Sequence, residues 1–102
     1  MIEEKQPPPG QPVQVEIGEK ESEGIYSNFV LIAHSASEFI IDFARILPGL
    51  SKAKVFSRIV MTPQHAALLH EALAENIRKY EARFGKIKVY GQKEDTTKTL
   101  GF

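Results

Sequence analysis

The sequence contains no cysteine among its 102 residues. This excludes a disulfide framework, a thiolate nucleophile and a cysteine-ligated zinc site. The longest apolar run, Phe29–Ala33, is far shorter than the ~20 residues that a membrane-spanning helix needs. Met1 is followed by Glu3 and Glu4 and not by the basic stretch and apolar core of a signal peptide. We therefore expect a cytoplasmic protein with no contact to a membrane.

The formal net charge at pH 7 is zero, so nothing global attracts nucleic acid or an anionic membrane. A content of 42% hydrophobic and 25% charged residues is ordinary for a globular protein. The length is that of one domain. Charge is nevertheless uneven, because the first quarter of the chain is acidic and the last part is basic. We interpret both as solvated segments.

Motifs of common catalytic sites are missing as well. The sequence has no glycine-rich phosphate loop, no GxSxG turn and no HExxH pair. His65 and His70 are five residues apart, so they do not share a helix face well. Glu38 and Asp42 lie about 13 Å apart if the strand rises ~3.3 Å per residue, too far for a coupled carboxylate pair. We predict no catalytic, cofactor-binding or metal-binding residues and no enzymatic activity.

The chain divides into three segments. Residues 1–12 contain four prolines and are expected to form a flexible leader. Residues 13–90 carry the periodic apolar pattern of a single α+β domain. Residues 91–102 are polar and are expected to be a disordered tail.

Alternating apolar residues predict four strands in the domain. Their expected ranges are Val13–Ile17, Ile25–His34, Glu38–Arg45 and Ala53–Met61. Short polar or glycine-containing connections favour antiparallel pairing of neighbours. The predicted fold is a four-stranded antiparallel sheet followed by one long amphipathic helix, in the order β-β-β-β-α. A short extra edge strand is expected after the helix, at about Ile87–Tyr90.

The helix is predicted over Thr62–Phe84. Thr62 is suited to the N-cap position, and Pro63 to the first helical position, where its missing N–H costs nothing. Gly85 fits the position after the helix, which favours a positive φ. One apolar stripe recurs every three or four residues, through Ala66, Leu69, Leu73, Ile77, Tyr80 and Phe84.

A single helix covers only one face of a sheet, yet the predicted strands are apolar on both faces. We expect the helix to pack on Phe29, Leu31, Phe39, Ile41, Phe43, Val55 and Ile59. The far face would then expose Val30, Ile32, Ile40, Phe56 and Val60. So large an apolar patch is unusual on a monomer. The sequence therefore predicts a homodimer or higher homo-oligomer joined through this face; cover by the chain's own terminal segments is the alternative.

Polar residues fall on the same predicted far face. They are Asn28, Asp42 and Arg58. Because an isolated buried charge is costly, we expect an Asp–Arg ion pair there with a structural role. Small-molecule binding or catalysis around this cluster at a subunit interface is retained as an alternative.

Nucleic-acid binding is a second alternative, which the sequence favours less. Basic residues gather near the end of the predicted helix, at Arg78, Lys79, Arg83, Lys86 and Lys88, with aromatic residues between them. Cations near a helix C-terminus are also favoured by the helix dipole alone.

Several short motifs resemble a known family. The strings YSNF at Tyr26–Phe29, EFIIDF at Glu38–Phe43 and TPQHA at Thr62–Ala66 are similar to those of short bacterial and archaeal proteins of a domain family of unknown function. The resemblance spans about Val13–Ile87 and implies no activity. The expected layout is also similar to the core of the secretion chaperone SecB, although this chain lacks its second carboxy-terminal helix, and a shared layout does not transmit function.

The leading functional hypothesis is accordingly a non-enzymatic, oligomeric protein-binding module of the adaptor or chaperone type. Its expected partners are further copies of itself and other polypeptides.

Overall fold

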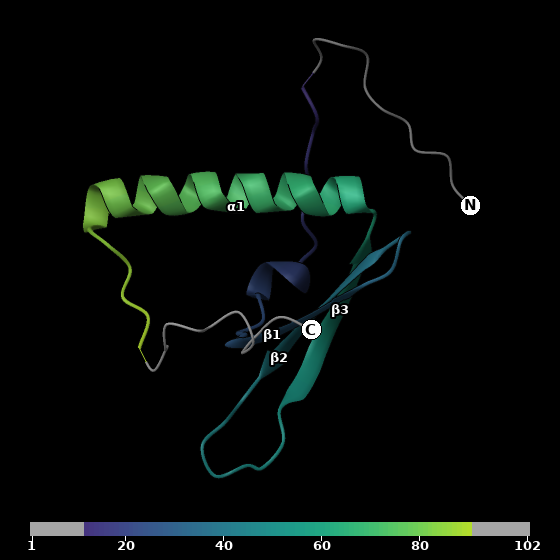
Figure 1. Cartoon of the computed structure of the whole chain (residues 1–102), viewed down its shortest axis with the longest axis vertical. Coiled ribbons are helices and arrows are strands. Elements are labelled where there is room, and N and C mark those ends of the chain that lie inside the picture. Colours follow the sequence, from purple (N-terminus) through teal and green to yellow (C-terminus); the bar gives the residue numbers. More distant parts are fainter. Residues whose placement is uncertain (1–11, 91–102) are drawn as a thin grey trace.

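The computed structural model describes residues 12–90. A 3-10 turn, η1 (Glu21–Glu23), precedes three strands, β1 (Phe29–His34), β2 (Phe39–Arg45) and β3 (Lys54–Met61), and a helix, α1 (Pro63–Phe84). The strands form one antiparallel sheet in the order β1-β2-β3. Figure 1 shows α1 leaving the end of β3 and diverging from the sheet. The α+β class and the antiparallel sheet followed by one helix are as predicted.

The sheet has three strands and not four. Val13–Ile17 is extended without a strand partner, and its apolar side chains are strongly exposed, Val15 at 87%. Alternation alone is satisfied by any extended segment, whereas a strand also needs a neighbouring backbone to pair with. The expected strand after the helix is absent too, as far as residue 90. The predicted leader and carboxy-terminal tail lie outside the described residues, apart from Pro12.

The register of the sheet is fixed by pairs such as Ile32↔Ile41 and Ile41↔Ile59. A bulge interrupts β3, because Phe43 pairs with Ser57 while Ala44 pairs with Val55. Phe56 is therefore the extra residue of the bulge. Its ring lies under the guanidinium of Arg45, 4.1 Å from the ring centre.

The sheet has two faces, which differ in what lies over them. The inner face, turned toward α1, consists of Val30, Ile32, His34, Phe39, Ile41, Phe43, Ser57, Ile59 and Met61. The outer face consists of Phe29, Leu31, Ala33, Ile40, Asp42, Ala44, Val55, Arg58 and Val60. Both faces are thus largely apolar, which agrees with the two-sided pattern in the sequence.

The core of a single chain is very small. Within the described residues, the only buried apolar side chains are Ile41 and Ala44, exposed by 7% and 0%. No residue of α1 is buried, and the helix makes only sparse contact with the strands. Within one chain, the predicted packing of the helix stripe on the sheet is therefore limited to an open contact at the amino-terminal half of α1.

The junction between β3 and α1 explains this separation. A single residue, Thr62, connects Met61 to Pro63, whereas connections between strands and helices usually take two to six residues, typically about four. The hydroxyl of Thr62 accepts a hydrogen bond from the backbone N–H of His65 at 3.2 Å, and it lies 2.9 Å from Nδ1 of the same residue. Thr62 is thus the N-cap and Pro63 opens the helix, as predicted. With a single connecting residue, the direction of α1 is set directly at the end of β3.

Replacement of Thr62 by alanine should remove this cap. The expected loss is about 1 kcal/mol in the free energy of unfolding, because one backbone N–H loses its acceptor. Urea unfolding followed by circular dichroism measures it. Thr62→Ser, which keeps the hydroxyl, should lose only a small part of this amount; an equal loss in both variants would contradict a capping role.

A candidate protein-interaction surface

The inner face carries two recesses, and the first lies under α1. Side chains of Ile32, Phe39 and Ile41 form its floor, and the amino-terminal half of the helix contributes Leu69 and Leu73 to the opposite wall. The volume of this cavity is about 440 Å³. Its walls are almost wholly apolar, and His70 is the exception from the helix. The helix and sheet thus form an open wedge and not a closed core.

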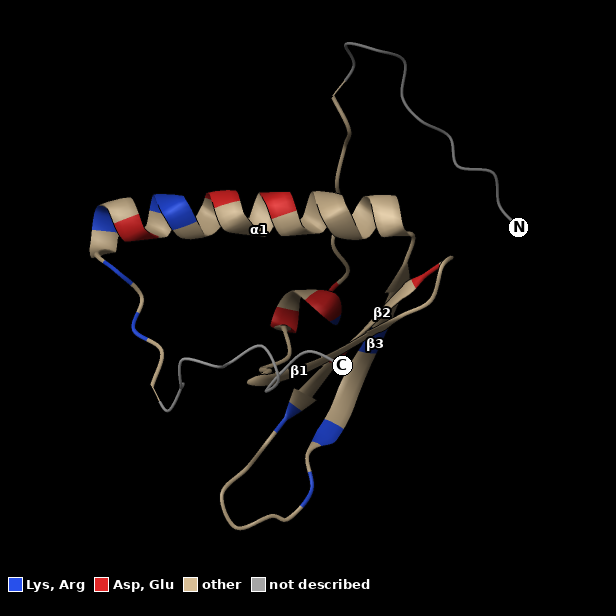
Figure 2. Ribbon diagram, in the orientation of Figure 1, with Lys and Arg blue, Asp and Glu red and all other residues tan. Residues whose placement is uncertain are grey.

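The second recess continues along the inner face beside η1. Its floor is Phe43, Ser57 and Ile59, and its rim includes Glu21 and Glu23 of the turn. The volume is about 480 Å³. Figure 2 shows the acidic residues of η1 next to the sheet. Lys20 also lines the rim, so this recess joins a largely apolar floor to a rim with two acidic residues and one basic residue.

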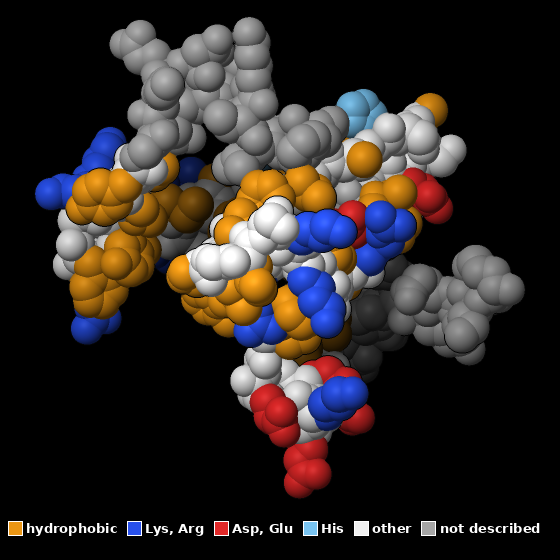
Figure 3. Space-filling view, turned by 90° about the horizontal axis from the view of Figure 1, so that it is seen from below, with side chains coloured by type: hydrophobic (Ala, Val, Ile, Leu, Met, Phe, Trp, Pro, Cys, Tyr) orange, Lys and Arg blue, Asp and Glu red, His pale blue; other side chains and the backbone are white. Residues whose placement is uncertain are grey.

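The carboxy-terminal half of α1 extends away from the strands with its apolar stripe uncovered. The exposed fractions of Ile77, Tyr80 and Phe84 are 39%, 50% and 65%. The rings of Tyr80 and Phe84 lie 4.9 Å apart and form a continuous aromatic surface. Figure 3 shows hydrophobic side chains spread over large parts of one side of the molecule. Surfaces of this kind usually mark interaction sites.

The outer face carries one charged pair among its apolar residues. Asp42 accepts two hydrogen bonds from Arg58, from Nε at 2.7 Å and from an Nη nitrogen at 2.9 Å. The Asp42 side chain is 11% exposed and that of Arg58 is 63% exposed. These hydrogen bonds, helped by the charge of Arg58, hold the pKa of Asp42 below its ordinary value although partial burial opposes the shift. The same bonds raise the pKa of Arg58.

The lowered pKa of Asp42 has a consequence for acid stability. A carboxyl whose pKa is lower in the folded state stabilises the fold above its unfolded value of about 3.9, and this stabilisation is lost as the pH falls through the folded pKa. We expect Asp42→Asn to lower the melting temperature at pH 7 and to lose less further stability between pH 5 and pH 3 than the parent protein. Thermal melts across this range measure both effects; parallel curves for the two proteins would contradict a stabilising role.

The five residues predicted for the oligomer interface do not share one face. The register places Ile40 and Val60 on the outer face, but Val30 and Ile32 on the inner face with Ile41. The prediction assumed that odd-numbered residues of β1 and odd-numbered residues of β2 lie on the same face of the sheet. In the structure, even-numbered residues of β1 pair with odd-numbered residues of β2, as in Ile32↔Ile41. This shift of one residue moves every side chain of β1 to the face opposite the predicted one. Phe56 sits in the bulge. That any of these residues lies in an interface remains a prediction.

The predicted polar cluster is also divided. Asp42 and Arg58 lie together, whereas the side chain of Asn28 bonds to the backbone of Ile46, accepting from its N–H at 2.8 Å and donating to its carbonyl at 3.1 Å. Asn28 thereby fastens the beginning of β1 to the end of β2. Its side chain therefore has a structural role and does not join Asp42 and Arg58 in one polar site.

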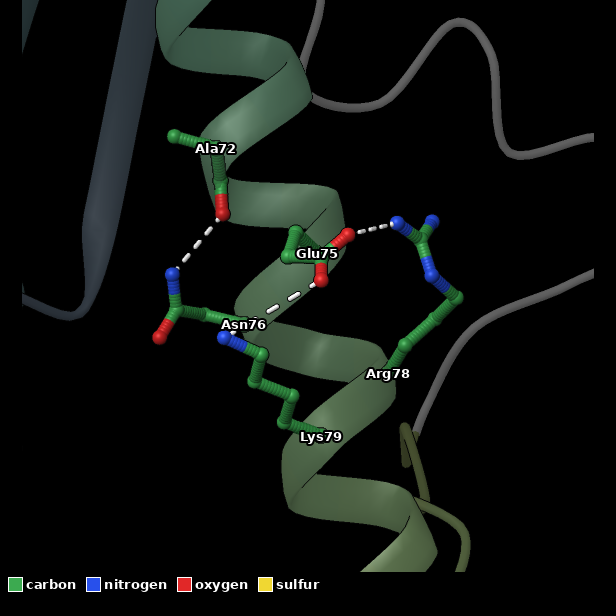
Figure 4. Close-up of polar contacts among 5 residues, drawn as sticks. All are labelled: Ala72, Glu75, Asn76, Arg78 and Lys79. Carbon is green, nitrogen blue, oxygen red and sulfur yellow. Dashed lines mark hydrogen bonds and ion pairs between the residues drawn. The ribbon is translucent and has the colours of Figure 1, made fainter.

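The basic residues of the nucleic-acid alternative are dispersed. Glu75 binds both Arg78 and Lys79, the latter at 3.9 Å, and Figure 4 shows these contacts on the helix surface. Arg83 lies over the ring of Phe84, 5.3 Å from its centre. Lys86 and Lys88 follow in the extended segment beyond the helix. That these five residues bind nucleic acid remains a prediction.

The histidines are held by separate local contacts. His34 stacks on Phe39, His65 bonds to Thr62 and His70 lines the first recess. Within residues 12–90, no three potential metal ligands come together. Nor does any helix in that range combine the length and apolar character needed to cross a bilayer.

The sequence reasoning missed the acidic rim. The glutamates between Gly18 and Gly24 are obvious as a charged loop, but only the folded chain places Glu21 and Glu23 beside Phe43 and Ile59. No local signal links these segments, which lie about twenty to forty residues apart in the sequence.

Comparison with known proteins gives a family and nothing more specific. No curated protein matches the chain, and no solved structure matches it either. A family profile matches residues 1–89, a range that includes every strand and the whole helix. Its description is a protein of unknown function, DUF3467. Because the match covers most of the chain, this protein belongs to the DUF3467 family.

Proposed function

We propose that this protein is a non-enzymatic, cytoplasmic homo-oligomer that binds other polypeptides, in the manner of an adaptor or chaperone. The observation that carries the proposal is the excess of exposed apolar surface over buried core. Two apolar side chains are buried in the described part of the chain, whereas large apolar residues on the helix, on β3 and before β1 are exposed by more than a third.

Physical energetics favours assembly for such a chain. Full burial of one large apolar side chain stabilises by about 1.5–3 kcal/mol, while ordering each residue of backbone costs roughly 1–2 kcal/mol. A single helix and a three-stranded sheet that hardly touch each other gain little of this burial. A second chain that covers the wedge and the helix stripe would supply what the single chain lacks.

The other two candidate functions receive less support. Nucleic-acid binding requires free cations along one surface, but Arg78 and Lys79 both form ion pairs with the carboxylate of Glu75. Ligand binding around Asn28, Asp42 and Arg58 requires those side chains to converge, whereas Asn28 bonds elsewhere. Exposed apolar surface is the feature that only the protein-binding proposal uses.

The test is the absolute mass of the protein, measured by light scattering on a sizing column over a range of concentrations. We expect a mass at least twice that of the single chain at micromolar concentration. A single-chain mass throughout the range would overturn the oligomer.

Polypeptide binding needs its own measurement. A reduced, carboxymethylated protein that cannot fold serves as the probe, and its binding is followed by fluorescence anisotropy. We expect saturable binding that salt weakens little, because the interaction is apolar. The same protein in its native, disulfide-intact form is the matched control and should not bind. Equal binding of both forms, or of neither, would contradict the proposed activity.

A further inference from the structure

We propose that the carboxy-terminal half of α1 docks in the second recess of an identical chain, which returns the same contact. The occupant is thus a second copy of this protein, and the interface is a reciprocal exchange of helix ends. The inference rests on the oligomer proposed above and names the surfaces that form it.

The first argument is geometric. The helix diverges from its own strands (Figure 1), and no residue of α1 lines the second recess of the same sheet. That recess stays open beside Phe43 and Ile59. One copy thus has an uncovered helix end and an uncovered recess. In a dimer with twofold symmetry, the helix end of each copy can cover the recess of the other.

The second argument is shape and chemistry. The recess has an apolar floor and a volume of about 480 Å³, and the helix end presents two adjacent aromatic rings. Aromatic side chains anchored in pockets are the usual centres of protein interfaces. Ile59 on the floor is 41% exposed and Phe84 is 65% exposed, so each has surface for the other to cover.

The third argument is charge. The rim of the recess carries Glu21 and Glu23 against a single Lys20, so its net charge is negative, and the helix end carries Arg83, followed by Lys86 (Figure 2). Within residues 12–90, the ion pairs are Asp42–Arg58, Glu75–Arg78 and Glu75–Lys79, so neither the rim nor Arg83 has an ionic partner in that part of the chain. Docking would bring the acidic rim of one copy to the basic end of the other.

The fourth argument is area. Full burial of an aromatic side chain removes about 150–250 Å², so four half-exposed stripe residues from Leu73 to Phe84 offer about 400 Å². The recess that receives them is smaller and loses clearly less surface than the helix end does. Because each copy contributes one helix end and one recess, the pair would bury about 1,100 Å² in total, a little above the ~1,000 Å² that a specific interface needs.

Single cysteines test the contact directly, because the natural sequence has none. One protein carries Ser57→Cys in the floor of the recess, and the other carries Asn76→Cys beside the helix stripe. The two are mixed, allowed to exchange subunits and treated with a short bismaleimide. Since each chain has one thiol, every product that joins positions 57 and 76 connects two chains. We expect the mixture to give several-fold more of this product than a control mixture with Ala82→Cys, on the opposite side of the helix.

A charge exchange gives a second readout. Arg83→Glu should weaken association by about 3- to 30-fold, because the contact occurs twice in the symmetric pair. Adding Glu21→Lys to the same chain should recover part of this loss. Arg78→Glu, which reverses a charge on the far side of the helix, is the matched control and should leave association unchanged.

The outcomes separate this inference from the proposed function. An oligomeric mass with no more crosslinking than the Ala82→Cys control would overturn the helix exchange and leave the oligomer standing. A single-chain mass would overturn both. Failure of Glu21→Lys to restore any association to Arg83→Glu would overturn the charged part of the contact.

Discussion

Replacement of Ile77 by aspartate is expected to convert the assembled protein into single chains. Ile77 lies in the apolar stripe of α1 and is 39% exposed in one chain. Full burial of a large side chain is worth about 1.5–3 kcal/mol, so covering the exposed 39% of Ile77 in two copies is worth about 1–2.5 kcal/mol, and an unpaired carboxylate in the contact adds a cost of desolvation. A tenfold change in affinity corresponds to about 1.4 kcal/mol, so the lost burial alone should weaken the dimer by about 10- to 50-fold, and the buried carboxylate should weaken it further. Sedimentation equilibrium or light scattering over a concentration series measures the change.

The control for this prediction is Ala82→Asp. Ala82 lies on the same helix, two positions beyond Tyr80 and therefore on the opposite side, and it is exposed. It receives the same charge at a larger cost in helix propensity, because alanine is the best helix former, so an effect of Asp on the helix alone should be at least as strong here. Association should be unchanged in this variant. Equal weakening by both variants would show that the added charge acts on the helix itself and not on an interface.

Truncation of Ile41 to alanine is expected to give the largest loss of stability of any conservative core change. Ile41 is 7% exposed, lies at the centre of β2 and pairs with Ile32 and Ile59 on the two neighbouring strands. Removing a buried isoleucine side chain costs about 2–5 kcal/mol, because the apolar burial is lost and a cavity remains. A domain with only two buried apolar residues has little stability to lose, so the variant should be largely unfolded near room temperature. Urea unfolding and amide exchange measure this.

Ile59→Ala is the informative companion to this variant. Ile59 is 41% exposed in one chain, so its truncation should cost clearly less than that of Ile41 if the protein functions alone. If a partner helix covers Ile59, the two truncations should cost similar amounts, and the loss at Ile59 should depend on protein concentration. A small, concentration-independent loss at Ile59 would contradict coverage of the second recess.

Local features were predicted well from the sequence. The ranges of β2, β3 and α1 differ from the expected ones by one residue at most, because each has a strong apolar period and clear end signals. The Thr62–Pro63 start of the helix follows from the needs of unpaired N–H groups alone. Gly85 has φ +97°, a positive value favoured by glycine, and donates a hydrogen bond to the carbonyl of Glu81 as the helix ends.

Features that depend on distant residues were predicted poorly. The segment Val13–Ile17 has a strand-like pattern but no strand to pair with, so its alternation has no structural consequence. The assignment of faces failed because the parity of β1 relative to β2 depends on the turn Ser35–Ser37, and a shift of one residue exchanges all side chains between faces. The bulge at Phe56 has no local signature either.

The sequence by itself determined that the strands are apolar on both faces and that the helix has one apolar stripe. These are periodicities of neighbouring residues, and neighbouring residues obey local geometry. Only the tertiary structure decided where those surfaces point. The helix begins one residue after β3 and diverges from the inner face (Figure 1), and the folded chain places Glu21 and Glu23 beside Ile59. Relative directions of elements arise from contacts and connections between distant segments, which no local pattern encodes.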